Sequence, residues 1–128
     1  TGGASGIGRA LGELFLARGM NVVLADIEQS ALDATVAALA AAGGNCIGVV
    51  TDVSRAEDVQ KLADTALAEF GAIHIACNNA GVFAGGLLWE QSLADYQWQL
   101  DVNVWGSCDG DAIFRDLPYD QARCAECE

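Results

Sequence analysis

Apolar residues recur along the first hundred positions in two rhythms: short unbroken runs, and a helical spacing of three or four residues. The unbroken runs predict three buried strands, at residues 22–26, 46–51 and 73–77. The helical spacing predicts four helices, at residues 6–18, 29–42, 54–70 and 92–104, the third opened by a capping box of Ser54 and Glu57. Strands that alternate with helices predict an α/β domain with a parallel sheet and right-handed crossovers.

Composition narrows the classes of function. The chain has 128 residues, of which 52% are hydrophobic and 19% charged, so it can bury a core as one domain. Its net charge of -12 argues against nucleic acid and anionic membrane surfaces as partners. We see no stretch that would span a bilayer and no leader, which favours the cytoplasm. Five cysteines, an odd number, argue against a disulfide framework.

A glycine-rich segment, TGGASGIG, occupies residues 1–8. Such a turn before a helix can bring backbone N–H groups against a pyrophosphate. Gly2 would allow the sharp turn, Gly6 the approach of the phosphates, and Gly8 close packing of the helix on a strand. Glycines also cluster in plain turns. The strand that ends on Asp26 favours the nucleotide interpretation, because an acid at that point can bind a ribose diol.

Four further segments complete a pattern: Asp26, the pair Asp52 and Val53, NNAG at residues 78–81, and DVNVWG at residues 101–106. With TGGASGIG, they resemble the short-chain dehydrogenase/reductase family over residues 1–106. The resemblance implies a Rossmann-like, doubly wound parallel sheet. It also implies an oxidoreductase that moves a hydride between NAD and a small alcohol or carbonyl substrate, as a homo-oligomer when full length.

The resemblance also implies the site. A carboxylate at Asp26 would accept hydrogen bonds from the adenosine ribose and repel a 2′-phosphate, which favours NAD over NADP. Ser5 and Ile27 agree, because relatives that prefer NADP often carry a basic residue at these positions. Asn103 would be the family's active-site asparagine, which holds a water linked to a catalytic lysine. The implied cofactor-binding residues are Gly2, Ser5, Gly6, Ile7, Gly8, Asp26, Asp52, Val53, Asn79, Ala80 and Gly81.

The family's catalytic serine and Tyr-x-x-x-Lys motif are not found in this sequence. Tyr119 and Arg123 share the spacing, but they follow Asn103 too closely, and an arginine cannot share a proton as a lysine does. Ser107 stands before any plausible active-site strand. Two alternatives to the enzyme therefore stay open: a non-catalytic NAD(H)-binding module, and a non-functional gene fragment.

The character of the sequence changes after Gly106. Residues 107–128 show no convincing helical period, and we interpret them as an atypical tail produced by a frameshift or a truncation. Cys124 and Cys127 form a C-x-x-C pair, but with His74 as the only histidine we expect no metal site.

The predicted sheet has no first strand. In the strand order 3-2-1-4-5-6 that strand is central and would end before Thr1. The strands at 22–26 and 73–77 would then lack the neighbour between them. We therefore expect this chain alone to be marginally stable or molten, with exposed sheet edges.

Overall fold

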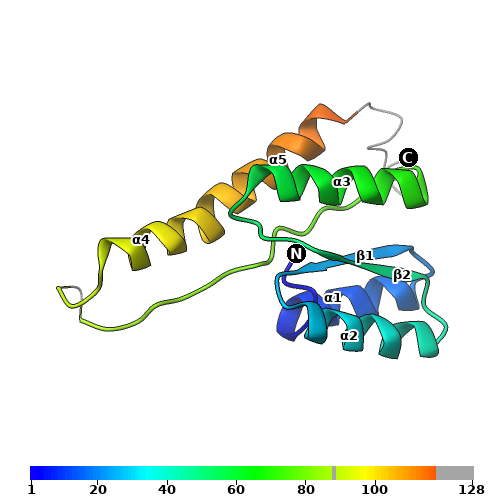
Figure 1. Cartoon of the computed structure of the whole chain (residues 1–128). Helices are drawn as coiled ribbons and strands as arrows, with labels where there is room; N and C mark the ends of the chain where they lie inside the picture. Colours follow the sequence, from blue (N-terminus) through cyan, green and yellow to red (C-terminus); the bar gives the residue numbers. More distant parts are fainter. Residues whose placement is uncertain (88, 118–128) are drawn as a thin grey trace.

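A computed structural model describes residues 1–87 and 89–117 of the chain. Its sheet has two parallel strands, β1 (Val22–Asp26) and β2 (Cys46–Val50), paired in register from Val22 opposite Cys46 to Asp26 opposite Val50 (Figure 1). Both strands are rich in β-branched residues, which suit a buried pleated surface. The prediction of a parallel pair connected by a helix is confirmed.

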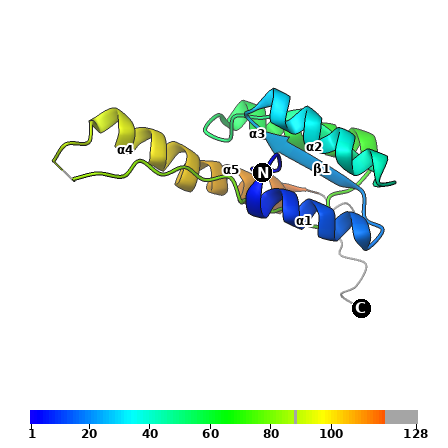
Figure 2. The same ribbon diagram turned by 90° about the horizontal axis from the view of Figure 1, so that it is seen from below.

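Helices cover the two faces of this sheet. On one face lie α1 (Gly6–Ala17) and α2 (Gln29–Ala41), and on the other lie α3 (Ala56–Phe70) and α5 (Gly106–Asp116) (Figures 1 and 2). One core joins α1 and α2 to the strands, and its buried residues are Ala4, Val22, Leu24, Leu32, Leu39 and Cys46. A second core, of buried Val53, Val59 and Val102, lies beside α3.

The third predicted strand is wrong: residues 73–77 run close to the sheet but form no ladder. A gap separates this segment from β1. Cavities of about 430, 130 and 110 Å³ lie in it, and each is lined by both Val23 and Ile75. A strand needs a hydrogen-bonded neighbour. Among the residues that the structure describes, Thr1 and Gly3 bridge the gap. The N-terminal ammonium of Thr1 donates to the Cys77 carbonyl at 2.9 Å, and Gly3 N donates to the Ala25 carbonyl at 2.9 Å.

The predicted capping box at the start of α3 is also wrong. The helix begins at Ala56 with Arg55 at its N-cap, and Glu57 pairs with Arg55. Ser54 instead donates its backbone N–H and its hydroxyl to Asp52 Oδ1, because an aspartate turn two residues earlier takes both groups. A capping box does occur at α4 (Leu93–Leu100), where the Ser92 and Asp95 side chains exchange hydrogen bonds with each other's backbone N–H.

The sequence pattern suggested that helical structure ends at Gly106, but the structure continues as a helix beyond it. After α4, a π-helical turn η1 (Asp101–Trp105) leads directly into α5. The face of α5 that meets the body of the molecule carries Gly106, Gly110 and Ile113. A Cβ at Gly106 would stand 2.8 Å from Val53 O, and one at Gly110 would stand 2.9 Å from Asn78 Cγ. The two glycines allow close contact but are not hydrophobic. The helical spacing of this face therefore does not appear in the pattern of hydrophobic residues. The division into a dinucleotide-binding part at residues 1–106 and an atypical tail at residues 107–128 stays a prediction.

Residues 81–87 and 89–92 form, together with α4, an arm that projects from the two cores (Figure 1). Its apolar side chains are strongly exposed, with Phe83 at 85%, Trp89 at 80% and Leu93 at 86%. Among the described residues, no helix has both the length and the apolar character needed to cross a membrane.

Candidate functional site

The glycine-rich segment forms a tight loop that leads into α1. Gly2 has a φ of 65°, a conformation that favours glycine, as the predicted sharp turn requires. A Cβ on Gly8 would stand 2.7 Å from Asn79 Nδ2 and 2.8 Å from Gly2 C, so Gly8 lets the helix approach this loop. The predicted close packing of helix on strand falls instead at Gly12, whose Cβ would lie 2.8 Å from Leu24 Cδ2 on β1.

The start of α1 is open to an anion. Ser5 is its N-cap in extended conformation and makes no side-chain capping bond, and the first turn carries no acidic residue. The first backbone N–H groups of a helix have no intrahelical partner and lie at the positive end of its dipole. Ser5, Gly6 and Ile7 are exposed there, and a Cβ on Gly6 would meet nothing within 4 Å. This geometry fits a pyrophosphate.

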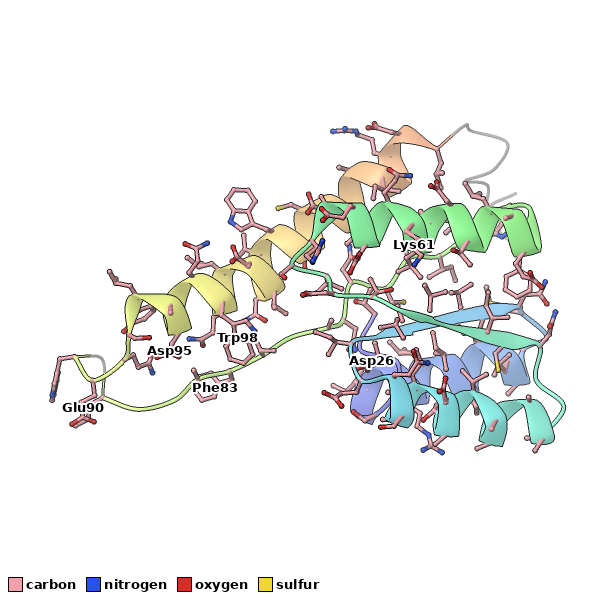
Figure 3. The ribbon with its side chains drawn as sticks, viewed as in Figure 1. Asp26, Lys61, Phe83, Glu90, Asp95 and Trp98 are labelled. Atoms are coloured by element: carbon pink, nitrogen blue, oxygen red, sulfur yellow. The ribbon has the colours of Figure 1, made fainter. Side chains whose placement is uncertain are left out.

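Asp26 lies at the end of β1, beside the glycine loop (Figure 3). Its Oδ2 accepts a hydrogen bond from Ala4 N at 3.0 Å, and its Oδ1 accepts one from Glu28 N at 3.1 Å. These two donors fix the plane of the carboxylate. Each oxygen can still accept a further hydrogen bond, as a ribose diol would require.

The residues after β2 divide between surface and core. Thr51 N donates to Asp26 O at 3.0 Å, which places Asp52 at the same end of the sheet as Asp26. Asp52 is partly exposed, whereas the Val53 side chain is buried in the second core. A ligand at this end could therefore meet Asp52 directly, while the Val53 side chain packs against protein.

Thr1 binds the NNAG segment to the glycine loop. Its hydroxyl accepts hydrogen bonds from Asn79 N and Ala80 N, both at 3.0 Å, and Asn79 Nδ2 donates to Thr1 O at 2.9 Å. Desolvation lowers the pKa of the Thr1 ammonium, and the nearby Cys77 and Asp26 oppose the shift. The sequence analysis missed Thr1 as an organising residue, although it is the first letter of the motif.

Asn103 holds the backbone that follows Gly81. Its Oδ1 accepts from Val82 N at 2.8 Å, and its Nδ2 donates to Val82 O at 2.9 Å. Four residues earlier, in the continuous helical segment of α4, η1 and α5, Gln99 Oε1 accepts a hydrogen bond from Ala84 N at 3.1 Å. Both ends of the Asn103 amide are therefore engaged with main chain, and a water held by this side chain would share or replace one of these bonds.

Most predicted site residues thus meet at one end of the strands. Hydrogen bonds join the glycine loop to Asp26 on one side and, through Thr1, to Asn79 and Ala80 on the other. Asn103 holds the next part of that segment through Val82. The Ser107 hydroxyl donates to Asn103 O at 3.3 Å, a contact between consecutive turns of the same helical segment. Within residues 1–87 and 89–117, no three histidine, cysteine or acidic residues gather as a metal site. Tyr119, Arg123, Cys124 and Cys127 lie outside the described residues.

The comparisons with known proteins agree on one family. The model of the short chain dehydrogenase family matches residues 1–114. The 1-deoxy-11-beta-hydroxypentalenate dehydrogenase of Streptomyces exfoliatus is 43% identical over 107 residues, which are 82% of this chain and 39% of that protein. Glucose 1-dehydrogenase 2 of Bacillus subtilis is 41% identical over 110 residues, covering 84% of this chain and 42% of that enzyme. The chain thus spans about two fifths of the length of these relatives.

Solved structures carry the same fold. A short chain dehydrogenase/reductase from Burkholderia phymatum, crystallised in complex with NAD, superposes with a TM-score of 0.91 at 49% identity. The match covers 94% of this chain and 43% of that one. A Brucella melitensis short-chain dehydrogenase/reductase of the glucose/ribitol dehydrogenase type superposes with a TM-score of 0.81 at 33% identity. The predicted Rossmann-like fold is confirmed, with a two-stranded parallel sheet in the described residues.

Proposed function

Because this chain belongs to the short chain dehydrogenase family, we propose that it forms the NAD-binding part of an oxidoreductase acting on a small alcohol or carbonyl compound. One observation carries the proposal: the Asp26 carboxylate is locked to the glycine loop through Ala4 N at 3.0 Å, beside the open N-terminus of α1. This pairs an acceptor for a ribose diol with donors for a pyrophosphate.

The chain's own residues would bind and orient the dinucleotide. The loop at residues 2–8 would cradle the pyrophosphate, and Asp26 and Asp52 would hold the adenosine end. Asn79, Ala80 and Gly81 would line the path to the nicotinamide. Asn103 would keep that path in place through its two bonds to Val82. A bound nicotinamide ring supplies the hydride acceptor or donor.

Local charge favours NAD over NADP in this proposal. A 2′-phosphate would approach the Asp26 carboxylate, and like charges placed together cost several kcal/mol. The neighbouring Ile27, which is 60% exposed, and the exposed Ser5 are both uncharged. Neither side chain therefore supplies a cation for that phosphate. We expect NAD to bind at least about tenfold more tightly than NADP, since each factor of ten corresponds to about 1.4 kcal/mol.

Calorimetric titration of the chain with NAD and with NADP tests this proposal. Because Asp26 also supports the loop, Asp26→Asn should weaken both ligands, so the informative quantity is their affinity ratio, which should move toward NADP. Ile27→Arg should move the ratio further, and Ile27→Gln, of similar size but neutral, should leave it unchanged. Equal affinities in the wild type would refute the NAD preference, and binding of neither would refute the proposed function of this chain.

Two parts of the sequence interpretation remain predictions at this point. Hydride transfer in this family calls for a serine and a Tyr-x-x-x-Lys motif, so turnover by these 128 residues alone is not expected. NAD binding without turnover would favour the non-catalytic module, and no binding would favour the gene fragment. The cytoplasmic location also stays a prediction.

We also propose that the arm supports self-association. Phe83, labelled on the arm in Figure 3, and Leu93 expose more than four fifths of their surface. Exposed apolar patches commonly mark protein interfaces. Leu93→Glu is a suitable probe, because an acidic residue suits the first turn of α4 and the side chain is 86% exposed. Sedimentation should show an oligomer that Leu93→Glu dissociates. A monomeric wild type would contradict this proposal.

A further inference from the structure

Thr35 is a buried polar side chain on a helix face that otherwise packs apolar residues. It lies in the middle of α2, one turn from both Leu32 and Leu39, and is 3% exposed. A threonine inside a helix commonly turns its hydroxyl back to the carbonyl four residues earlier. Thr65 in α3 does this with Lys61 O at 2.7 Å. Thr35 instead donates to Ala4 O, in the glycine loop, at 2.9 Å.

Ala4 is consequently held at both of its backbone groups. Its carbonyl accepts from Thr35 of α2, and its N–H donates to Asp26 of β1. These bonds fix two successive peptide planes, because the Ala4 carbonyl belongs to the same rigid unit as the Ser5 N–H. In a trans peptide the two groups point in opposite directions. With its carbonyl tied to α2, the Ala4–Ser5 unit therefore presents the Ser5 N–H away from α2, at the exposed start of α1.

We infer that Thr35 is a positioning residue for the dinucleotide loop. Its hydroxyl orients the Ala4–Ser5 peptide so that the Ser5 N–H is available to the ADP-ribose portion of a dinucleotide. This inference rests on the proposed function, because it assigns a ligand to the loop. Without the hydroxyl, the carbonyl would lose its buried partner, and the peptide could rotate and withdraw the N–H from a ligand.

ADP-ribose is the probe, because it contains the groups that would meet this loop. Thr35→Val removes the hydroxyl at nearly constant shape and should weaken ADP-ribose binding about tenfold. Thr35→Ser keeps the hydroxyl and should restore affinity to within about threefold of the wild type. Thr65→Val is the matched control, since it makes the same chemical change in α3 at a hydroxyl bonded within its own helix. It should leave the affinity unchanged.

Amide hydrogen exchange without ligand separates positioning from general support of the fold. In Thr35→Val, exchange should speed up at Ala4, whose N–H donates to Asp26 Oδ2, while Leu24 in β1 keeps its protection. Equal loss of protection at both sites, or failure of Thr35→Ser to restore binding, would overturn the inference and leave Thr35 as a packing residue. Unchanged affinity of Thr35→Val would also overturn it while the proposed function stands. A wild type that does not bind ADP-ribose would overturn both.

Discussion

Replacing Gly8 with alanine should disable the glycine loop without disturbing the two cores. The new Cβ would stand 2.7 Å from Asn79 Nδ2 and 2.8 Å from Gly2 C, whereas carbon atoms pack favourably at about 3.5–4.0 Å. The loop or Asn79 must therefore shift by nearly an ångström. Overpacking of this kind costs about 1–3 kcal/mol. A shift of Asn79 also threatens its 2.9 Å bond to Thr1 O, which adds about 1 kcal/mol.

The free chain can relieve this strain by moving its loop away from the form that binds a ligand. The strain therefore reappears as lost affinity, and roughly 3 kcal/mol corresponds to about a hundredfold weaker binding of ADP-ribose in calorimetric titration. Gly12→Ala is the matched control, one turn further along α1. Its Cβ would meet Leu24 Cδ2 at 2.8 Å, the end of a core side chain and not the backbone of the glycine loop.

Helix propensity makes this comparison sharper. Alanine is favoured over glycine inside a helix by about 1 kcal/mol, which offsets part of the cost of overpacking against Leu24. Gly12→Ala should therefore lose some stability at most and keep near wild-type affinity. Gly8→Ala receives the same benefit and should still lose affinity, because backbone cannot yield as a side chain can. If Gly8→Ala bound ADP-ribose as tightly as Gly12→Ala, the loop would not be the ligand site, and the steric reasoning would fail.

Three other predictions follow from the described contacts. Asn103→Ala should speed amide exchange at Val82 about tenfold, whereas Asn103→Asp, which keeps an acceptor, should protect it; equal exchange rates in all three proteins would contradict the assigned bonds. Hydrogen bonds from Ser92 hold the pKa of Asp95 below its usual value, so their stabilisation of α4 is complete above the unfolded pKa. It should be lost as pH falls through the lowered pKa, and the amide exchange of α4 should show this loss in the wild type but not in Asp95→Asn. Because cavities separate β1 from residues 73–77, the near-UV circular dichroism of the chain should be weak and its thermal unfolding broad. A five-residue apolar extension joined to Thr1 should sharpen the unfolding transition, whereas a glycine-serine extension should not. A strong, cooperative transition of the unextended chain would contradict this.

Sequence patterns were informative where hydrophobicity sets the structure. The runs around Leu24 and Val49 predicted β1 and β2, and the helical spacing predicted α1, α2 and the body of α3 to within two residues at most boundaries. Each of these elements buries one apolar face, and that requirement is local enough to be visible in the order of residues.

The missed features depend on partners distant in sequence. Residues 73–77 have the composition of a strand, but a ladder needs a neighbour, and β1 lies across a cavity-lined gap. The face of α5 is formed by Gly106 and Gly110, which hydrophobic spacing does not register. Ser54 had the spacing of a helix cap, yet Asp52 competes for its hydrogen bonds.

The candidate site divides in the same way. The glycines of residues 2–8 and Asp26 could be named from their chemistry and order, which suit a dinucleotide. Asp52, Val53, residues 79–81 and Asn103 were named from the family resemblance. The supports of these residues could not be named, because Thr1 and Thr35 act through backbone groups reached only in the folded chain. From the sequence, Thr35 is an ordinary helix residue between Leu32 and Leu39. Its role depends on the hydrogen bond from its hydroxyl to the Ala4 carbonyl, which only the folded chain forms.

The central claim is that the glycine loop and Asp26 form a dinucleotide site in this chain. Backbone amide chemical-shift mapping during titration with NAD tests it most directly. The account predicts saturable shifts concentrated at residues 2–8, 26–27, 52 and 79–81, with little change along the exposed face of α3 around Lys61. No shifts at millimolar NAD, or shifts confined to the gap between Val23 and Ile75, would contradict it.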